Sequence, residues 1–297
     1  MEIYLVGGAV RDKLLNYPSK DRDDVVVGSS VDEMLQQGFE QVGKDFPVFL
    51  HPDTKAEYAL ARTERKIGGG YKGFEVHASP EVTLKEDLQR RDLTINAMSM
   101  APDGTLHDPF GGRADLAAGR IRFVGNAHDR IVEDVLRLLR YFRFYAYYGA
   151  SPPDTAALEA CRALAPRLPS LSGERVRVEV LKLLAAPNPL PSLFLMQATG
   201  VLQTFLPEAV ALTDLERLVA IEADHTVAVD AIRRLVILLD SDIKALAQVA
   251  DRLRLSNAER GYLLLTATES VSPRLGTVAL RRIIYRLGAG SFRELVL

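Results

Sequence analysis

The sequence changes character near residue 125, and this change constrains the fold more than any other feature of the chain. Before it, short runs rich in β-branched and aromatic residues are separated by Gly, Pro and Asp, which is typical of a small sheet with covering helices. After it, apolar residues recur at a helical spacing between Pro-containing breaks. The pattern therefore predicts an α+β fold in which a mixed head precedes an all-α remainder. The predicted strands cover residues 3–6, 24–27, 57–61, 73–77 and 121–124.

The helical part divides again at a proline pair near residue 188. From these breaks we predict three domains: a head at residues 1–125, a helical neck at 126–185 and a helical body at 186–297. The predicted helices cover residues 132–145, 156–163, 174–184, 190–198, 214–221, 229–239, 243–253, 257–267 and 279–287.

Composition excludes several classes of protein. With 297 residues, 47% hydrophobic and 26% charged, the chain has the composition of a globular fold. Its single cysteine, Cys161, excludes an intrachain disulfide, is expected in the core, and points to a reducing, cytoplasmic location. We expect no membrane helix and no signal peptide. The formal net charge of −2 gives no general basic field, so a polyanion would need a local basic patch.

Two glycines follow the first predicted strand and precede what reads as a helix. Gly7 and Gly8 allow backbone N–H groups to approach a phosphate closely, and the helix N-terminus adds a favourable partial charge. Arg11 would lie in the first turns of that helix, within reach of the same anion. Taken alone, such a pair more often makes only a tight turn.

Two carboxylates, Asp21 and Asp23, stand at the entry to the second predicted strand. Alternate residues of a strand share a face, so both carboxylates point the same way and repel each other unless a cation bridges them. Oxygen ligands of this kind suit Mg²⁺. Asp24 faces the opposite side and is the weaker candidate. A third carboxylate, Glu57, either faces solvent from an edge strand or joins the pair across the sheet.

Four segments, in this order, resemble the motifs of class II tRNA nucleotidyltransferases. These are the CCA-adding enzymes, which share a polymerase-β-type head with bacterial poly(A) polymerases, and the resemblance covers roughly residues 1–200. It implies an enzyme that adds C, C and A to the 3′ end of tRNA from CTP and ATP, without a template. The segments are Gly7-Gly8-Ala9-Val10-Arg11-Asp12, Asp21-Arg22-Asp23, Arg90-Arg91-Asp92-Leu93-Thr94-Ile95-Asn96-Ala97 and Glu133-Asp134-x-x-Arg137.

The resemblance assigns roles to individual residues. It makes Asp21 and Asp23 the catalytic carboxylates that bind Mg²⁺, where two ions would activate the RNA 3′-hydroxyl and help pyrophosphate leave. Gly8 and Arg11 match contacts to the triphosphate. Arg91 belongs to a charged triplet that runs into a buried segment and suits a ribose and phosphate. The last residue of that triplet, Asp92, is expected either to orient Arg91 or to cap the following helix.

The segment 133–143 is helical by pattern, with Glu133, Arg137 and Arg140 on one face and Asp134 one turn before Arg137. A carboxylate accepts a hydrogen bond and a guanidinium donates, so together they match the edge that cytosine and adenine share. Uracil and guanine present the reverse pattern and would meet unpaired or repulsive contacts. The resemblance gives Asp134 and Arg137 this role, with Arg140 beside them. Without the other motifs, a salt-bridged surface helix would be the simpler interpretation.

Residues 62–74 contain three consecutive glycines between basic residues. The resemblance places here a flexible loop that helps to switch from C to A, and a simple hinge is the alternative. Glu179, within the predicted helix 174–184, is expected to pair with Arg175. Arginines along the helices after residue 130 would hold the RNA by shape and phosphates rather than by sequence.

Two further functions stay open. One is a related enzyme with partial specificity, which adds only A or only CC, or makes a poly(A) tail. The other is a tRNA-binding module without catalysis, against which the intact Asp21 and Asp23 pair argues.

Overall fold

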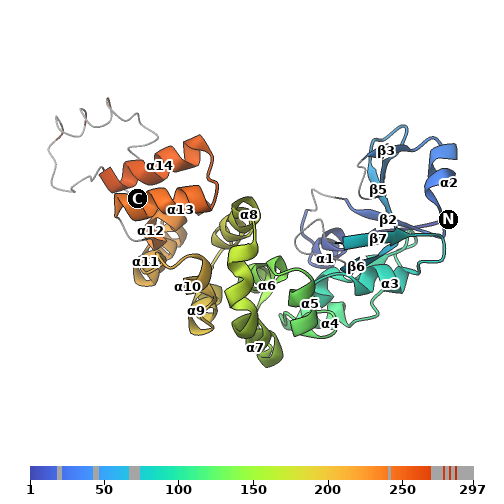
Figure 1. Cartoon of the computed structure of the whole chain (residues 1–297), viewed down its shortest axis with the longest axis horizontal. Helices are drawn as coiled ribbons and strands as arrows, with labels where there is room; N and C mark the ends of the chain where they lie inside the picture. Colours follow the sequence, from blue (N-terminus) through green and yellow to red (C-terminus); the bar gives the residue numbers. More distant parts are fainter. Residues whose placement is uncertain are drawn as a thin grey trace. The chain divides into compact units, whose positions relative to one another are not determined.

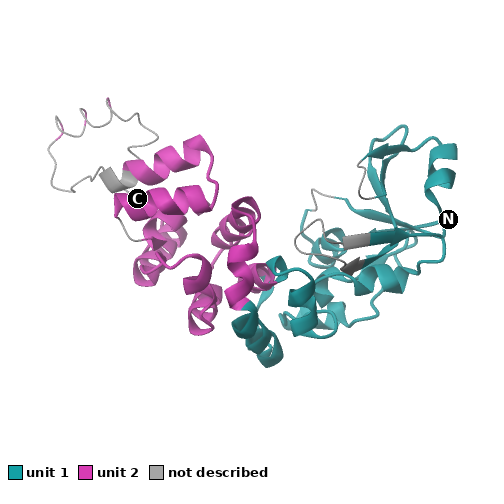
Figure 2. Cartoon of the chain, in the orientation of Figure 1, with its two compact units in different colours: residues 1–137, 148–164 teal, residues 138–147, 165–297 magenta. Residues whose placement is uncertain are grey.

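A computed structural model describes residues 1–18, 22–42, 47–66, 74–239 and 242–268, together with positions 277, 281 and 285. These residues form two compact units (Figure 2). Unit 1 comprises residues 1–137 and 148–164, and unit 2 comprises residues 138–147 and 165–297. Asp21, residues 67–73 of the glycine-rich loop, and most of the predicted helix 279–287 lie outside the described residues. The division at residues 125 and 185 stays a prediction.

Unit 1 is built on a mixed sheet of seven strands in the order β3-β4-β5-β2-β1-β8-β9 (Figure 1). Only β2 and β5 run parallel, and the other neighbours are antiparallel. A separate hairpin pairs β6 with β7. The predicted α+β head is therefore confirmed. The strands are β1 Glu2–Val6, β2 Asp24–Val27, β3 Glu40–Val42, β4 Val48–Leu50, β5 Glu57–Leu60, β6 Arg62–Lys66, β7 Phe74–Ala78, β8 Ser99–Met100 and β9 Leu106–His107.

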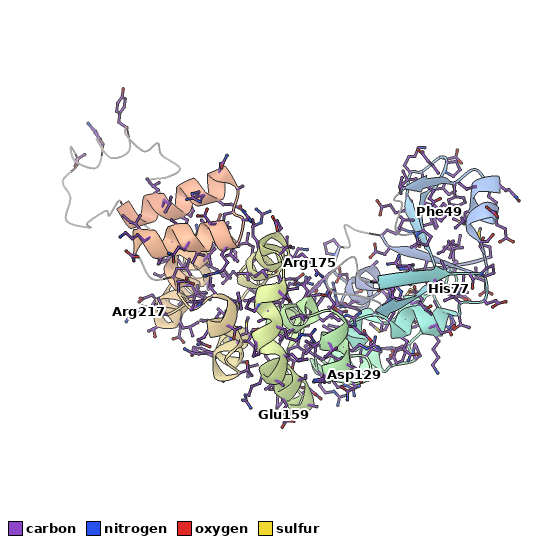
Figure 3. The ribbon with its side chains drawn as sticks, viewed as in Figure 1. Phe49, His77, Asp129, Glu159, Arg175 and Arg217 are labelled. Carbon is purple, nitrogen blue, oxygen red and sulfur yellow. The ribbon has the colours of Figure 1, made fainter. Side chains whose placement is uncertain are left out.

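The central strands are apolar on both faces because helices cover both. On one face Val25 packs with Val6, Ala61 and Leu88, the last of which comes from α3. On the other face Val26 packs in a cluster with Met34 of α2 and with Phe49, which is fully buried (Figure 3). Successive side chains of a strand point to opposite faces, so neighbouring valines fill two different cores.

Short capped helices complete unit 1. Ser30 and Glu33 form a capping box at the start of α2, and Thr83 and Glu86 form another at the start of α3. The helices are α1 Gly8–Leu14, α2 Val31–Gln36, α3 Leu84–Gln89, the 3-10 turn η1 Thr94–Asn96, α4 Gly112–Ala118, α5 Ala127–Glu133 and α7 Thr155–Leu164.

Residues 148–164 are tied back to unit 1 at the end of α4. The carbonyl of Gly119 accepts hydrogen bonds from the backbone N–H of Ala150 at 2.9 Å and of Ser151 at 3.1 Å. A Cβ added to Gly119 would lie 2.5 Å from that of Ala150, so only glycine fits here. The helix α7 also packs against α5.

The strand predicted at residues 121–124 is wrong. This segment makes one isolated bridge, between Leu93 and Phe123, and otherwise exchanges single backbone hydrogen bonds with the chain before η1. Ile121, Phe123 and Val124 are all buried. Their apolar character therefore reflects burial of an irregular segment, which periodicity alone does not separate from a strand.

The helix predicted at residues 132–145 is interrupted. The helix α5 ends at Glu133, and α6 (Leu136–Tyr148) begins three residues later. Asp134 between them is extended, with φ −144° and ψ 109°, and its Oδ1 accepts the backbone N–H of Leu136 at 3.1 Å. An aspartate side chain that bonds the nearby backbone competes with helix formation, which apolar periodicity does not reveal.

Unit 2 is helical, as predicted. Its helices from α8 to α14 fall on the predicted segments, with α10 as an addition. Within the described residues, none of the helices combines the length and apolar character needed to cross a bilayer. Besides residues 138–147 of α6, the elements are η2 Ala165–Ser170, α8 Gly173–Leu184, α9 Leu190–Ala198, α10 Val201–Phe205, α11 Leu212–Asp224, α12 Ala231–Leu238, α13 Ile243–Arg252 and α14 Asn257–Thr268.

A buried charge cluster joins three of these helices. Glu222 of α11 pairs with Arg233 at 2.9 Å and with Arg234 at 2.7 Å, both from α12, and all three side chains are at most 5% exposed. Arg234 also donates through Nη1 to the carbonyls of Leu184 at 2.7 Å and Ala186 at 2.5 Å. The cluster therefore fixes the end of α8 against α11 and α12.

Candidate active site

The turn between β1 and α1 brings two of the sequence motifs together, the first and the third. Gly7 adopts φ +66°, a conformation that favours glycine, and its backbone N–H donates to the carbonyl of Met98 at 3.1 Å. A Cβ added to Gly7 would lie 2.7 Å from Nη1 of Arg91, and one added to Gly8 would lie 3.5 Å from Nη2 of Arg11. The guanidiniums of Arg11 and Arg91 therefore both lie against the Gly7-Gly8 turn.

Arg11 is held by its neighbours in a buried position, with 8% of its surface exposed. Its Nη1 donates to Oδ1 of Asn96 at 2.7 Å, and its Nη2 donates to Oδ1 of Asp12 at 2.8 Å. The ring of Tyr148 lies under the guanidinium, 4.7 Å from Cζ to the centroid. Asn96 comes from the segment that carries Arg91, so the first and third motifs are joined directly.

Arg91 is oriented by Asp87 of α3, which accepts a hydrogen bond from Nη2 of Arg91 at 3.2 Å. Burial lowers the pKa of Arg91, and Asp87 and Asp23 oppose that shift by favouring the charged form. The Nε atom of Arg91 is a buried donor with no acceptor among the described residues. A buried donor without a partner costs free energy, so this guanidinium has capacity left for an anionic ligand.

Asp23 is exposed at the start of β2, and its carbonyl accepts the backbone N–H of Val6 at 2.9 Å. Because Asp24 pairs with Tyr58, the parallel register places Asp23 level with Glu57 on the neighbouring strand. The strand β5 is interior, so Glu57 does not lie on an edge strand, and its side chain is exposed. No cluster of three or more possible metal ligands occurs among the described residues, which do not include Asp21.

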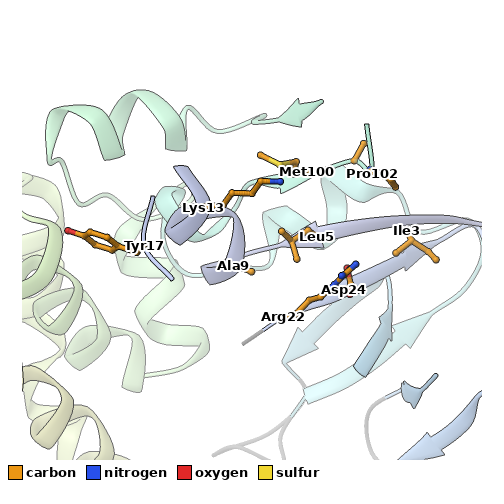
Figure 4. Close-up of a pocket in the computed structure, with 10 residues that line it drawn as sticks. Ile3, Leu5, Ala9, Lys13, Tyr17, Arg22, Asp24, Met100 and Pro102 are labelled. Atoms are coloured by element: carbon orange, nitrogen blue, oxygen red, sulfur yellow. Dashed lines mark hydrogen bonds and ion pairs between the residues drawn. The ribbon is translucent and has the colours of Figure 1, made fainter. Parts of the chain in front are cut away.

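A cavity of about 500 Å³ lies on the face of the sheet to which Leu5 and Asp24 point (Figure 4). Leu5 and Asp24, which pair with each other, both line it. The Asp24 side chain is 1% exposed and pairs with Nε of Arg22 at 2.6 Å. Since adjacent residues of a strand point to opposite faces, Asp23 points away from this cavity. The residues that line the cavity do not include Asp23, Gly7 or Arg91.

Arg137 is fixed from two sides. Its Nη1 donates to the carboxylate of Glu133 at 2.5 Å, and its Nη2 donates to the carbonyl of Arg90 at 2.9 Å. Arg130 also pairs with Glu133, at 3.1 Å, and donates to the carbonyl of Gln89 at 3.2 Å. Two guanidiniums thus meet the C-terminal carbonyls of α3, where the helix dipole favours positive charge. The backbone N–H of Arg137 bonds the carbonyl of Asp134 at 3.0 Å, so these two predicted base-selecting residues are adjacent.

Arg140 belongs to unit 2, where its Nη1 lies 3.8 Å from the buried carboxylate of Glu179. Arg143 lies closer to Glu179, at 2.6 Å, and its guanidinium also stacks on Phe144, 4.2 Å from the ring centroid. Glu179 therefore pairs with two arginines of α6. Its pairing with Arg175, which the sequence led us to expect, stays a prediction. The nucleotide-binding role of Arg140 stays a prediction.

The sequence motifs did not identify Asp87 and Glu64, the carboxylates that hold the arginines of this site. Asp87 is fully buried and binds both Arg90, at 2.7 Å, and Arg91. Glu64 of β6 accepts from Arg62 and from Arg90, each at 2.9 Å. The signal for Asp87 was present, because a Thr83 capping box starts a helix in which Asp87 precedes the two arginines by three and four residues. Asp92 accepts the backbone N–H of Leu93 at 2.8 Å and Nδ2 of Asn96 at 3.3 Å, beside the start of η1.

Comparison with known proteins identifies relatives of both parts of the chain. A family model described as the poly(A) polymerase head domain matches residues 3–122, and one described as a probable RNA- and SrmB-binding site of polymerase A matches residues 153–212. The multifunctional CCA protein of Chromobacterium violaceum is 48% identical over 275 residues, which are 92% of this chain and 65% of that protein. The corresponding protein of Nitrosococcus oceani is 54% identical over 209 residues, 70% of this chain and 51% of that protein. The chain thus spans between half and two thirds of these relatives.

Solved structures give the same result. The Thermotoga maritima CCA-adding enzyme in complex with tRNA is 25% identical, with a TM-score of 0.66 over 96% of this chain and 68% of that one. A CCA-adding enzyme in complex with ATP is 25% identical, with a TM-score of 0.69 over 99% of this chain and 72% of that one. The complex with CTP is 26% identical, with a TM-score of 0.66 over 99% and 73%. With two family models in the expected order and close curated relatives, the chain belongs to the family of poly(A) polymerase heads and CCA proteins, the class II tRNA nucleotidyltransferases that its motifs resemble.

Proposed function

We propose that this protein is a nucleotidyltransferase that adds C, C and A to the 3′ end of tRNA from CTP and ATP. The observation that carries the proposal is the position of Arg91, which lies against the Gly7 turn and within electrostatic reach of Asp23. The buried Nε of Arg91 has no acceptor among the described residues, which fits a site built for an anionic ligand. The relatives named for CCA addition support the same reaction.

Membership of the family implies a divalent metal ion, and we propose Mg²⁺ held by Asp21 and Asp23. The exposed carboxylates of Asp23 and Glu57, level on parallel strands, are the hard oxygen donors that Mg²⁺ prefers. When bound, the metal would lower the pKa of the RNA 3′-hydroxyl and offset negative charge at the α-phosphate. The protein's own contribution is to hold Asp23, just before β2, level with Glu57 on β5.

The triphosphate and ribose are assigned to Gly8, Arg11 and Arg91. Gly8 begins α1 beside the guanidinium of Arg11, so backbone N–H groups and a fixed cation converge on one point. Asn96 and Asp12 hold Arg11 in place before a nucleotide arrives. Prearranged donors lose little entropy when a phosphate binds, which lowers the cost of binding.

Base selection is assigned to Asp134 and Arg137, and Arg140 is assigned a nucleotide-binding role from its motif. Glu133 and the carbonyl of Arg90 hold the Arg137 guanidinium, and Asp134 lies at a break between two helices where its side chain is partly exposed. An acceptor beside a donor matches cytosine and adenine and mismatches uracil and guanine. This arrangement would select bases without a nucleic-acid template.

The proposed partner is the 3′ end of tRNA, whose phosphates would be bound by arginines of the helical part. The proposed location is the cytoplasm. The experiment supplies tRNA that lacks its 3′ CCA, together with Mg²⁺ and CTP, ATP or both, and resolves product length to single nucleotides. We expect two C and one A, in that order. A long tail from ATP alone would indicate a poly(A) polymerase, addition of A alone or CC alone a partial specificity, and binding without extension a tRNA-binding module.

Variants connect the reaction to the site. Asp21→Ala and Asp23→Ala are expected to abolish extension while tRNA binding, measured by filter retention, stays close to that of the wild type. Asp53→Ala is the matched control, because Asp53 is an exposed carboxylate of the same unit outside the site. Extension by either Asp variant at the wild-type rate would contradict the proposed roles.

A further inference from the structure

Asp87 is a fully buried carboxylate that none of the sequence motifs includes. It lies in α3 with 0% of its surface exposed. Its Oδ1 accepts from the backbone N–H of Arg62 at 3.3 Å and from Arg90 through Nε at 2.9 Å and Nη2 at 2.7 Å. Its Oδ2 accepts from Nη2 of Arg91 at 3.2 Å. One carboxylate therefore organises the two sequence-adjacent arginines and the start of β6.

The charge balance around Asp87 keeps it ionised. Burial disfavours the charged carboxylate, but the attraction of Arg90 and Arg91 outweighs it, so the pKa of Asp87 lies below its usual value. Arg90 has a second carboxylate partner in Glu64, at 2.9 Å. In the described part of the chain, Arg91 pairs with Asp87 and is attracted over a longer range by Asp23. The position of the Arg91 guanidinium therefore depends on Asp87 more strongly than the position of the Arg90 guanidinium does.

The orientation of Arg91 follows from this contact. One terminal nitrogen, Nη2, is held by Asp87, and the other, Nη1, lies where a Cβ of Gly7 would be 2.7 Å away. Because a guanidinium is planar, fixing one nitrogen and packing the other against the turn sets the whole plane. Without the Asp87 contact, no other side-chain hydrogen bond in the described residues would hold Arg91 against Gly7.

The same segment also supports Arg137. The carbonyl of Arg90 accepts Nη2 of Arg137 at 2.9 Å, and the side chain of Arg90 is held by Asp87 and Glu64. A shift of the Arg90-Arg91 pair would thus displace both the Arg91 guanidinium and the Arg137 guanidinium.

We propose that Asp87 is a positioning residue for nucleotide binding, whose carboxylate holds the Arg91 guanidinium against the Gly7 turn, ready for the phosphates or ribose of CTP and ATP. The inference rests on the proposed function and adds to it a residue that would contact no substrate. Its effect acts through Arg91, which distinguishes it from a general contribution to stability.

Replacing Asp87 by asparagine keeps the shape of the side chain and removes its charge. The new amide group donates hydrogen bonds, so it faces the donors of Arg90 and Arg91 and repels at least one of them. We expect the dissociation constants of ATP and CTP, measured by calorimetry without tRNA, to rise by about tenfold or more, the value of a charged hydrogen bond. Both nucleotides should be affected alike, because they share phosphates and ribose.

A double-mutant cycle separates positioning from stability. If Asp87 acts through Arg91, Asp87→Asn should change ATP affinity by less than about twofold in an Arg91→Ala background. Equal effects of Asp87→Asn with and without Arg91 would overturn the proposal, and so would wild-type affinity in the single variant. ATP is supplied at millimolar concentration so that weak binding by the Arg91→Ala protein is still measured.

The matched control is Glu222→Gln in unit 2. Glu222 is also a buried carboxylate shared by two sequence-adjacent arginines, Arg233 and Arg234. This variant should lower the unfolding temperature, as Asp87→Asn does, while ATP affinity stays within about twofold of the wild type. A similar loss of ATP affinity in Glu222→Gln would assign the effect to stability and overturn the proposal.

A second variant, and separate measurements of ATP binding and tRNA extension, distinguish failure of the Asp87 proposal from misfolding or failure of the proposed function. If Asp87→Asn does not fold, Asp87→Glu retains the charge and displaces it by one methylene, and it should still weaken ATP binding measurably; wild-type affinity would overturn the proposal. If the wild-type protein binds ATP but does not extend tRNA, the proposed function fails and the cycle still tests Asp87. If it binds neither nucleotide, the positioning role fails whatever the extension assay shows.

Discussion

Arg137 donates to the carboxylate of Glu133 at 2.5 Å across a break between two helices. The spacing of four residues would place the two side chains together on a continuous helix, and here they meet although Asp134 interrupts it. The carbonyl of Arg90 holds the same guanidinium from the other side, at 2.9 Å. Glu133 therefore orients Arg137, and Asp134 is left at the break with a different neighbour, the backbone of Leu136.

Glu133→Gln should loosen base selection. The amide keeps the shape of Glu133 but loses the charge that holds Arg137 and Arg130, so the Arg137 guanidinium gains freedom to meet other base edges. We expect the preference for CTP over UTP, measured as a ratio of kcat/KM, to fall by about tenfold. An unchanged ratio would show that the carbonyl of Arg90 orients Arg137 without help.

Asp134→Ala should change both stability and base choice. The side chain of Asp134 accepts a backbone N–H at the start of α6, and losing such a cap costs about 1 kcal/mol of unfolding free energy. The proposed base contact is lost as well, so discrimination against UTP and GTP should fall more than affinity for the triphosphate. Urea unfolding measures the first effect and single-nucleotide incorporation the second. A C and A preference equal to that of the wild type would contradict the proposed role.

Gly7→Ala should impair nucleotide binding more than stability alone explains. The backbone of Gly7 lies at φ +66°, which costs an alanine about 1 kcal/mol or more, and the new Cβ would lie 2.7 Å from Nη1 of Arg91. Arg91 must therefore move away from the turn. Thermal unfolding and ATP calorimetry are compared with Gly28→Ala, where φ is +70° and nothing lies within 4 Å of the added Cβ. Equal ATP affinities of the two variants would show that Arg91 tolerates the displacement.

The stabilising effect of Asp87 should disappear in acid. Attraction by Arg90 and Arg91 lowers the folded-state pKa of Asp87 below the value of about 3.9 typical of an unfolded chain. A depressed carboxyl pKa contributes stability that is complete above the unfolded pKa and is lost as the pH falls through the folded one. The difference in unfolding temperature between wild type and Asp87→Asn should thus be constant from about pH 5 to 8 and shrink below about pH 4. A difference that persists undiminished at low pH would contradict this account.

Arg234→Met should destabilise unit 2 strongly. Arg234 is 1% exposed and satisfies Glu222 together with the carbonyls of Leu184 and Ala186, so its loss leaves buried acceptors unpaired. Removing one partner of a buried ion pair typically costs about 3–5 kcal/mol of unfolding free energy. Urea denaturation followed by circular dichroism measures it. Arg217→Met, at an exposed position of α11, is the control and should change stability by less than about 0.5 kcal/mol.

The strands and helices with strong periodicity were predictable, and the site was predictable in part. Short runs of β-branched and aromatic residues identified β1, β2 and β5, and helical spacing identified most of unit 2. The three-residue strands β3 and β4 were missed because so short a run carries no clear period. The order of the sheet was also inaccessible, since pairing between distant strands leaves no local signal.

Within the site, the motifs named Arg11 and Arg91 as nucleotide-binding residues, which stays a prediction, but did not name the residues that hold them. Arg11 and Arg91 were predicted to share a ligand, and the structure places both against the Gly7-Gly8 turn. Asn96 was not assigned to hold Arg11, because a hydrogen bond across 85 residues is a property of the fold alone. Asp87 was missed although its spacing of four residues from Arg91 is a local signal. Asp134 was placed on a helix because apolar spacing continues through it, whereas its side chain ends that helix.

Unit 1 is discontinuous in sequence, and this affects how the protein is made. Residues 148–164 belong to unit 1, yet they follow ten residues of unit 2, so the packing of α5 against α7 cannot form until α7 has been synthesised. On a ribosome that makes about 5–20 residues per second, the sheet can form early while the unit as a whole waits for residue 164. A nascent chain that ends near residue 137 would therefore expose the apolar side of α5 and become a substrate for chaperones or proteases.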